Sequence, residues 1–301
     1  MIDSIKKVKK TTFENNYRFS VLIPSWNNLK YLMLCIKSLQ KNSYLKLQII
    51  VIINEGKDGT LEWVESQNNI DYVYSPQNLG ICYGLNAARS LVQSEYIVYM
   101  NDDMYVLPNW DIMLEERIRE LNTKMFMLSS TLIEPTDTGN NCVVVADYGS
   151  DTDTFKEEEI LDNFKKLYRN NWLGSTWPPN VMHVDTWDLV GGMSIEFSPG
   201  MYSDPDLSIK MYLAGVRIFE GIGNSLVYHF GTKSTKRIKK NKGKDTFLLK
   251  WGISAKTFSK EILKRGFDKE STNIENKINK TLFCKNKIKR ILACFRAKNI
   301  K

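Results

Sequence analysis

The sequence has few cysteines and no paired cysteine motif, and this excludes two classes of protein. The number of cysteines is odd, and no two of them form a CxxC pair. A disulfide framework and a structural zinc site are therefore not expected, and a reducing cytoplasm fits this usage best. The cysteines are Cys35, Cys82, Cys142, Cys284 and Cys294.

Long apolar runs are also lacking. The longest strongly apolar run near the start, residues 47–53, is far shorter than the roughly 20 residues that cross a bilayer. The basic N-terminus is not followed by an apolar region, so no signal peptide is expected. The remaining composition, 43% hydrophobic and 25% charged over 301 residues, is typical of a globular protein with a sizeable core.

Positive charge is scarce in most of the chain and concentrated near its end. Residues 232–301 hold 22 of the 42 Lys and Arg but only 5 of the 34 Asp and Glu. The net charge of this part is +17, whereas that of residues 1–231 is −9. This asymmetry indicates an anionic partner for the tail, either a membrane surface or a nucleic acid.

Short apolar runs alternate with helical patterns in the first hundred residues. The expected strands are 19–23, 47–53, 71–74 and 95–100, and Pro24 is expected to end the first of them. The expected helices are 29–40, capped by Asn27 or Asn28, followed by 60–66 and 83–91. The alternation predicts an α/β fold with a mostly parallel sheet flanked by helices.

Each expected strand is followed by a polar cluster. These clusters are residues 25–28, 54–58, 78–80 and 101–103. Ligands of parallel sheets bind beyond the carboxyl ends of the strands, so the four clusters predict one site.

Asn101-Asp102-Asp103 is the first candidate for chemistry. Adjacent carboxylates repel each other unless a cation offsets them, and Mg²⁺ or Mn²⁺ is commonly held by one or two carboxylates plus phosphate oxygens. A solvated turn that caps a helix is the alternative. The position after an apolar strand, among three other polar loops, favours the metal.

The second candidate is the segment 197–207, followed by His229, one of only two histidines. Asp204 lies in a loop with Gly and Pro and is a candidate general base for an acceptor hydroxyl. Asp204 and Asp206 also suit a helix N-cap and a first-turn acid. His229 lies among apolar and aromatic residues, so a buried structural histidine is its alternative role.

The order of these segments resembles glycosyltransferase family 2 over about residues 18–235. The resemblance lies in FSVLIPSWNN, IIVIINEGKDGT, NLGICYGLNAA, YIVYMNDDM, GGMSIEFSPGMYSDPDLSIKMYLAGV and VYHFGTKST. It implies a GT-A fold, a nucleotide-diphosphate-sugar donor, a divalent metal (Mn²⁺ or Mg²⁺) and inversion at the sugar carbon.

The resemblance also implies roles for single residues. Asn101-Asp102-Asp103 is similar to the family's DxD motif, with Asp103 and His229 as metal ligands and Asp204 as catalytic base. The residues implied for the nucleotide-sugar are Pro24, Ser25, Trp26, Asn27, Asn54, Glu55, Asp58, Asn78, Gly80, Asn86, Asn101 and Asp102. Three positions depart from the family pattern: Asn101 replaces the first acid of the motif, Asn54-Glu55 replaces an acidic pair, and Ser203 precedes Asp204 in place of an acid.

The middle of the chain is rich in tryptophan. Trp172, Trp177 and Trp187 suit either a platform for an acceptor sugar or anchors in the core. Trp177, Tyr202 and Asp206 are the acceptor candidates. A helix is expected over 153–168.

The expected organisation is a basic extension (1–17), a glycosyltransferase domain (18–235) and a basic helical tail (236–301). Within the domain, 18–130 is the nucleotide-sugar half and 131–235 the acceptor half. The tail is expected to be helical over 247–266 and 278–296. The second helix is amphipathic and basic, which suits an anionic leaflet or a helix packed on the core with a solvated face.

These features predict metal-assisted transfer of a sugar to a hydroxyl of a polysaccharide, lipopolysaccharide or lipid-linked saccharide, as in cell-surface polysaccharide biosynthesis. Separate acidic loops for metal and base favour inversion. The enzyme is expected in the cytoplasm, peripheral on the inner face of the plasma membrane. A sugar nucleotidyltransferase is the alternative, but the loop PSWNN lacks the glycines and cations that grip a triphosphate. A nucleic-acid-binding protein that uses the tail is the third reading.

Overall fold

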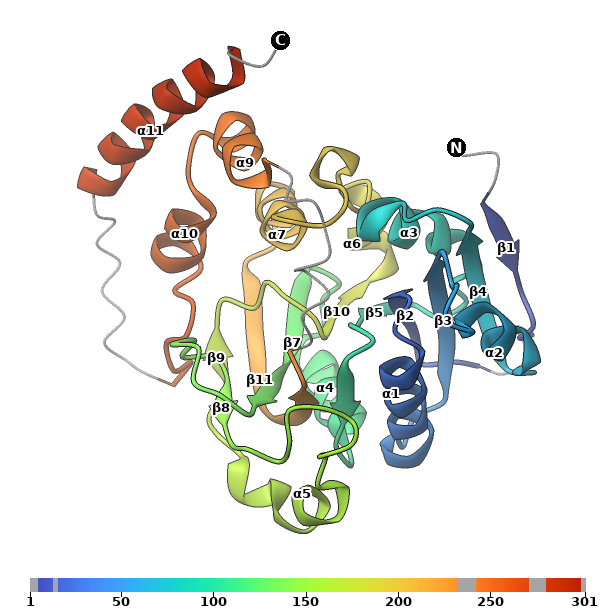
Figure 1. Ribbon diagram of the computed structural model, residues 1–301. Coiled ribbons are helices and arrows are strands. Elements are labelled where there is room, and N and C mark those ends of the chain that lie inside the picture. Colours follow the sequence, from blue (N-terminus) through green and yellow to red (C-terminus); the bar gives the residue numbers. More distant parts are fainter. Residues whose placement is uncertain (1–4, 13–15, 232–241, 271–279, 299–301) are drawn as a thin grey trace.

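The computed structural model describes residues 5–12, 16–231, 242–270 and 280–298. Within these residues an 11-stranded mixed sheet forms the centre, and helices cover both of its faces (Figure 1). The predicted α/β fold is confirmed.

The secondary structure follows the chain in this order. The strands are β1 (Lys6–Val8), β2 (Phe19–Trp26), β3 (Leu47–Asn54), β4 (Ile70–Ser75), β5 (Tyr96–Tyr99), β6 (Met104–Val106), β7 (Phe126–Glu134), β8 (Val144–Val145), β9 (Trp172–Leu173), β10 (Asn180–His183) and β11 (Ile218–His229). The α-helices are α1 (Leu29–Asn42), α2 (Thr60–Ser66), α3 (Gly80–Ala88), α4 (Trp110–Leu121), α5 (Glu157–Asn163), α6 (Val184–Leu189), α7 (Ser203–Leu213), α9 (Gly243–Trp251), α10 (Ala255–Thr257) and α11 (Lys280–Lys298).

The sheet is parallel in its first half and mixed in its second. Strands β4, β3, β2 and β5 are parallel neighbours, as the alternation of strands and helices predicts. Beyond β5, the antiparallel strand β10 joins β5 to β7, and β11 runs parallel to β7 and antiparallel to β6. Strand β1, from the segment expected as a basic extension, adds an antiparallel edge to β4.

Alternate residues of the central strands face opposite layers of the core. Val21, Ile23 and Val51 pack with α1 and α4 on one face, whereas Leu22 and Ile50 pack with α3 and α7 on the other. Because both faces are buried, these strands read as continuous apolar runs in the sequence.

Pro24 does not end the first strand, contrary to expectation. Strand β2 continues to Trp26, and Pro24 pairs with Ile52 of β3. The Leu22 carbonyl accepts a hydrogen bond from the Met100 N–H, so the backbone of Leu22 faces β5. Pro24 is two residues further along the strand, and its backbone therefore faces β5 as well. Pairing with β5 has ended at Leu22, and the missing N–H of proline therefore leaves no ladder bond unmade.

The helix expected over 83–91 begins earlier, at Gly80, and the one expected over 29–40 ends later, at Asn42. Three further predicted helices differ more in extent from the observed ones. Residues 153–156 precede α5, and a short 3₁₀ turn at Phe164–Leu167 follows it. The helix expected over 247–266 is interrupted at Gly252, where φ is 73°. The helix expected from 278 is described from Lys280, since Ile278 lies outside the described residues, as does most of the Lys-rich run 233–244. None of the described helices combines the length and hydrophobicity needed to cross a membrane.

Candidate active site

A pocket of about 500 Å³ opens at the carboxyl edge of the parallel strands. Residues from all four polar clusters that follow the predicted strands line it. The lining residues are Pro24, Ser25, Trp26, Asn28, Asn54, Asn78, Gly80, Ile81, Tyr99, Asn101, Asp102, Asp103, Pro199, Gly200, Met201, Tyr202, Asp204, His229 and Gly231.

The acidic pair at the floor of the pocket lies in the turn between β5 and β6. Asp102 and Asp103 are only 8% and 6% exposed, so their charges are largely removed from water. Carboxylates buried side by side need a cation, donors or a proton to offset their repulsion.

The register of three strands brings His229 and Glu134 to Asp103. Strand β11 pairs with β6 so that His229 lies opposite Met104, the residue after Asp103. It also pairs with β7, placing Tyr228 opposite Ile133, the residue before Glu134. His229 Nε2 is 3.5 Å from Asp103 Oδ1, and its Nδ1 is 3.0 Å from Glu134 Oε1.

The two carboxylates decide the charge of this imidazole. Burial alone would lower the pKa of His229, but the contacts with Asp103 and Glu134 outweigh it and raise the pKa to about 10. In the protein without a cation, the ring is therefore protonated and bridges two carboxylates.

The same atoms fit a divalent cation. Two donors bound at right angles to one Mg²⁺ at about 2.1 Å lie roughly 3 Å apart, and Asp103 Oδ1 and His229 Nε2 are 3.5 Å apart. Glu134 on the other ring nitrogen would fix the tautomer, as carboxylates commonly do behind a metal-binding histidine. Among the described residues no three His, Cys, Asp or Glu side chains form a ready metal cluster. Other ligands would have to come from a phosphate group and water.

Asp204 enters the pocket from the first turn of α7. The residue before the helix, Tyr202, has φ of 72°, a conformation uncommon for residues other than glycine, and it leads the chain into the pocket wall. Asp204 Oδ1 is buried without a hydrogen-bond partner, and burial raises the pKa of this carboxyl to about 7.

The raised pKa of Asp204 makes the stability of the fold depend on pH. Its pKa is higher in the folded protein than its usual 3.8, so the unpaired charge increasingly destabilises the fold as pH rises from about 4 to 7. Asp204→Asn removes this cost. We expect the gain in unfolding free energy to be roughly 2–3 kcal/mol larger at pH 8 than at pH 5. Denaturant titration of both proteins at the two pH values measures it, and an equal gain at both would show that the carboxyl is not perturbed.

Other buried polar atoms around the pocket also lack partners. Ser25 Oγ and Asn28 Nδ2 are buried and make no hydrogen bond within the described residues. Together with Asp204 Oδ1 they line one cavity. Buried polar groups are nearly always satisfied in native proteins, so this concentration marks a place for a polar ligand.

Gly80 joins the start of α3 to the loop before α7. Its φ is 75°, and a Cβ there would lie 2.4 Å from Pro199 Cα. The Ile81 N–H donates to the Pro199 carbonyl, and Asn78 Oδ1 accepts from the Gly80 N–H. The implied donor residues Asn78 and Gly80 thus lie directly against the loop that leads to Asp204.

Several residues implied for the donor hold loops together and do not line the pocket. Asn27 donates to Glu55 and accepts from the Lys57 N–H. Asp58 accepts from the Leu29 N–H and so caps α1, a role that the sequence suggested for Asn27 or Asn28. Asn86 bonds both backbone groups of Met193.

Of the acceptor candidates too, some line the pocket and others hold the fold together. Tyr202 lines the pocket. Asp206 is fully buried, accepts from Trp251 Nε1 at 2.8 Å and pairs with Lys250 at 2.9 Å. It therefore fixes α7 to α9.

The three tryptophans do not form a platform. Trp172 and Trp187 are buried in the core. Trp177 is half-buried and stacks on Trp172 with ring centroids 5.5 Å apart, outside the pocket lining.

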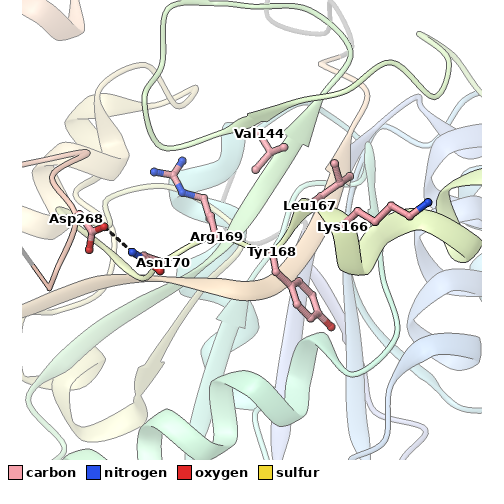
Figure 2. A pocket seen from close by; sticks show the side chains of 7 residues that line it. All are labelled: Val144, Lys166, Leu167, Tyr168, Arg169, Asn170 and Asp268. Carbon is pink, nitrogen blue, oxygen red and sulfur yellow. Dashed lines mark hydrogen bonds between the residues drawn. The ribbon is translucent and has the colours of Figure 1, made fainter.

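Sequence reasoning missed Glu134 and Tyr99. It named Asn28 only as a helix cap and a member of the polar cluster 25–28, and Pro199–Met201 only within the candidate segment 197–207. Glu134 follows residues 126–133 (FMLSSTLI), where three polar residues interrupt the apolar ones, so the signal for a strand end was weaker there than before Asn101. A second hollow, lined by Val144, Lys166, Leu167, Tyr168, Arg169, Asn170 and Asp268 (Figure 2), shares no residue with the pocket.

Comparison with known proteins identifies the part of the chain that builds most of this site. Residues 20–141 match the family model described as Glycosyl transferase family 2. This segment belongs to glycosyltransferase family 2. The family 2 segment contains β2–β7 and the pocket residues from Pro24 to Asp103.

Two curated relatives carry glycosyltransferase names. WcaA of Escherichia coli K12, named as a colanic acid biosynthesis glycosyl transferase, is 26% identical over 128 residues, 40% of this chain and 44% of that protein. Glycosyltransferase GlyG of Streptococcus pneumoniae serotype 4 is 25% identical over 105 residues, 34% of this chain and 35% of that protein. The chain thus aligns with less than half the length of either relative.

Solved structures extend the likeness beyond the family 2 segment. S. aureus TarS, residues 1–349 with UDP-GlcNAc, covers 94% of this chain and 76% of its own at 13% identity, with a TM-score of 0.54. GalNAc-T7 with UDP, GalNAc and Mn²⁺ covers 82% and 50% at 13% identity, with a TM-score of 0.56. At these identities the likeness establishes the fold, and the predicted GT-A architecture is confirmed.

Proposed function

We propose that this chain is an inverting, metal-assisted glycosyltransferase that moves a sugar from a nucleotide-diphosphate donor to an acceptor hydroxyl. One observation carries the proposal. A cation-compatible pair, Asp103 and His229, and a carboxylate whose Oδ1 is buried without a partner, Asp204, face the same pocket from different elements. This separation of an electrophilic and a basic group is what displacement at a sugar carbon needs.

The donor is assigned to the first half of the domain, residues 18–130. The end of β2 contributes Ser25 and the loop after it Asn28, whose buried polar atoms lack partners. Asn54, Asn78 and Asn101 line the same pocket. Neutral donors and acceptors of this kind suit a nucleoside and a sugar. The structures of TarS and GalNAc-T7 contain UDP-GlcNAc and UDP, respectively, which supports a nucleotide donor.

Asp103 and His229 are the residues that would hold a Mn²⁺ or Mg²⁺ ion, with Asp102 nearer the donor. A cation bound there would neutralise the charge that develops on the departing diphosphate. Glu134 keeps His229 Nε2 turned toward Asp103 by holding Nδ1. GalNAc-T7 was solved with Mn²⁺, which is consistent with this assignment.

Asp204 accepts the proton of the acceptor hydroxyl as the new bond forms. A hydroxyl is a poor nucleophile, and a base with a pKa of about 7 is ionised and effective near neutral pH. The base lies on α7, whereas Asp103 lies in the turn before β6 and His229 at the end of β11, so the hydroxyl and the leaving group approach the sugar carbon from different walls. Attack opposite the leaving group inverts the anomeric centre.

The acceptor half, residues 131–235, places Tyr202 and the loop Pro199–Met201 beside Asp204. We assign the acceptor to a saccharide or lipid-linked saccharide of a surface polysaccharide. The name of WcaA refers to such a pathway, colanic acid biosynthesis. The enzyme would then act in the cytoplasm.

A nucleotidyltransferase fits the pocket less well. It would need cations near the β2–α1 loop to grip a triphosphate. The first cation after this loop is Lys30, and its ammonium group pairs with Asp153.

The deciding experiment measures binding and hydrolysis of a panel of nucleotide-sugars with Mn²⁺, Mg²⁺ or EDTA. We expect one donor to bind and react only with a metal, and its transfer product to have the inverted anomeric configuration. Failure of every nucleotide-sugar to bind would refute the function, and a retained configuration would refute the mechanism.

A further inference from the structure

Helix α11 exposes a row of large apolar side chains. Ile288, Ile291, Leu292 and Phe295 are 61%, 58%, 51% and 63% exposed. Their spacings of three, four and seven residues place them on one face of a helix. We refer to these four residues as the apolar stripe.

The opposite face of α11 packs on the body of the protein. Asn286 and Ala293, seven residues apart, are buried. Asn286 Nδ2 donates to Thr257 Oγ1 at 2.9 Å, and Asn286 Oδ1 accepts from the Ser254 N–H at 3.3 Å. At 100° per residue these two positions lie roughly opposite the apolar stripe, so the stripe points away from the body. Figure 1 shows α11 at the outer edge of the molecule beside α9.

The charges of α11 are all of one sign. Its sequence, KTLFCKNKIKRILACFRAK, contains no Asp or Glu. Lys285 and Lys287 lie at the two edges of the apolar stripe on the helical wheel, and both are exposed. Apolar side chains flanked on both sides by cations are typical of a helix that lies in the interface of an anionic membrane.

We propose that α11 docks on an anionic lipid surface, with its apolar stripe in the acyl boundary and its cations on the headgroups. The sequence left open whether this helix binds a membrane or packs on the core. The structure shows that one face packs and leaves the stripe without a partner among the described residues. A nucleic acid would bind the cations but would leave the apolar stripe exposed to water. A second copy would bring the same cations against each other, which is unfavourable.

The position of α11 ties this surface to the proposed acceptor side. Arg296 of α11 pairs with Asp245 of α9, and Trp251 of α9 bonds Asp206 of α7. Helix α7 carries Asp204 in its first turn. If the proposed function holds, the same face would present a lipid-linked acceptor to this half of the pocket.

Flotation of the full-length protein with vesicles tests the proposal without using activity. We expect binding to phosphatidylglycerol-containing vesicles and little binding to pure phosphatidylcholine. The double substitution Ile291→Ser/Phe295→Ser should weaken binding at least about tenfold. Lys285→Gln/Lys287→Gln should weaken it by about tenfold or more and reduce its salt dependence.

A matched control uses equally exposed leucines on other helices. Leu189 and Leu213 are 64% and 65% exposed at the ends of α6 and α7. Leu189→Ser/Leu213→Ser should bind vesicles as the wild type does, and circular dichroism should show all variants folded. Unchanged binding of the stripe variant would overturn the proposal. So would binding to RNA without binding to vesicles, or a dimer in light scattering that the stripe substitutions dissociate.

Discussion

Replacing Asp204 by asparagine should lower the turnover number by about 10²–10⁴-fold while leaving the affinity for the donor nearly unchanged. Asn cannot accept the acceptor proton, but it has almost the same size and can occupy the same buried position at the start of α7. Steady-state kinetics with saturating donor separates the two effects, because we assign donor binding to residues 18–130 and not to Asp204.

The pH dependence of turnover gives a second measurement. A base works only when deprotonated, and burial raises the pKa of Asp204 to about 7. The wild-type rate should therefore fall about tenfold per unit as pH drops below this value. The residual rate of Asp204→Asn should not show this fall at low pH. If Asp204→Asn keeps both the wild-type rate and its fall at low pH, Asp204 is not the base.

Asp206 supplies the control for this substitution. It lies two residues further along the same helix, but its carboxylate bonds Trp251 and Lys250 of α9. Asp206→Asn should lower the unfolding free energy by on the order of 1–3 kcal/mol, since it breaks a buried charged contact. The folded fraction should keep its turnover within about tenfold. An equal loss of turnover in both variants would mean that the helix position, and not the base, is disturbed.

The strands and loops of the first half could be predicted because their signals are local. Each central strand is buried on both faces, so it appears as an apolar run, and each run ends in polar residues at the carboxyl edge. The structure brings these clusters into one pocket. Helix α2 matches the predicted limits, Thr60–Ser66, since turn residues bound it on one side and polar residues on the other.

The second half of the domain could be predicted less well, because its structure depends on contacts between residues far apart in the sequence. Glu134 and Asp103 are separated by 30 positions, and only the register of β11 with β7 and β6 places both at His229. Trp172 and Trp187 are in the core because β9 and α6 pack there, although their Pro-rich surroundings suggest a surface loop. The capping of α1 by Asp58 is likewise a contact between distant segments, the loop after β3 and the first residue of α1.

The second large effect concerns the cation. Asp103→Ala should abolish metal-dependent donor binding and reduce turnover by on the order of 10³-fold or more, because a metal supplies several kcal/mol of stabilisation to the leaving group. Mn²⁺ titration followed by electron paramagnetic resonance, in the presence of a nucleoside diphosphate, measures the loss without relying on activity. Glu120→Gln, an exposed acid on α4, is the control and should bind Mn²⁺ as the wild type does.

Glu134→Gln separates the role of the second carboxylate from that of the first. Glu134 Oε1 contacts Nδ1 of His229, 3.0 Å away on the far side of the ring from Asp103, while its Oε2 accepts from Thr138. Partners of this kind typically contribute 10–100-fold to metal affinity. We therefore expect Mn²⁺ binding between that of the wild type and that of Asp103→Ala. If Glu134→Gln binds Mn²⁺ like the wild type, His229 needs no orienting partner. If Asp103→Ala binds Mn²⁺ like the wild type, the cation is held elsewhere, and Asp103 and His229 form an ion pair that serves the fold.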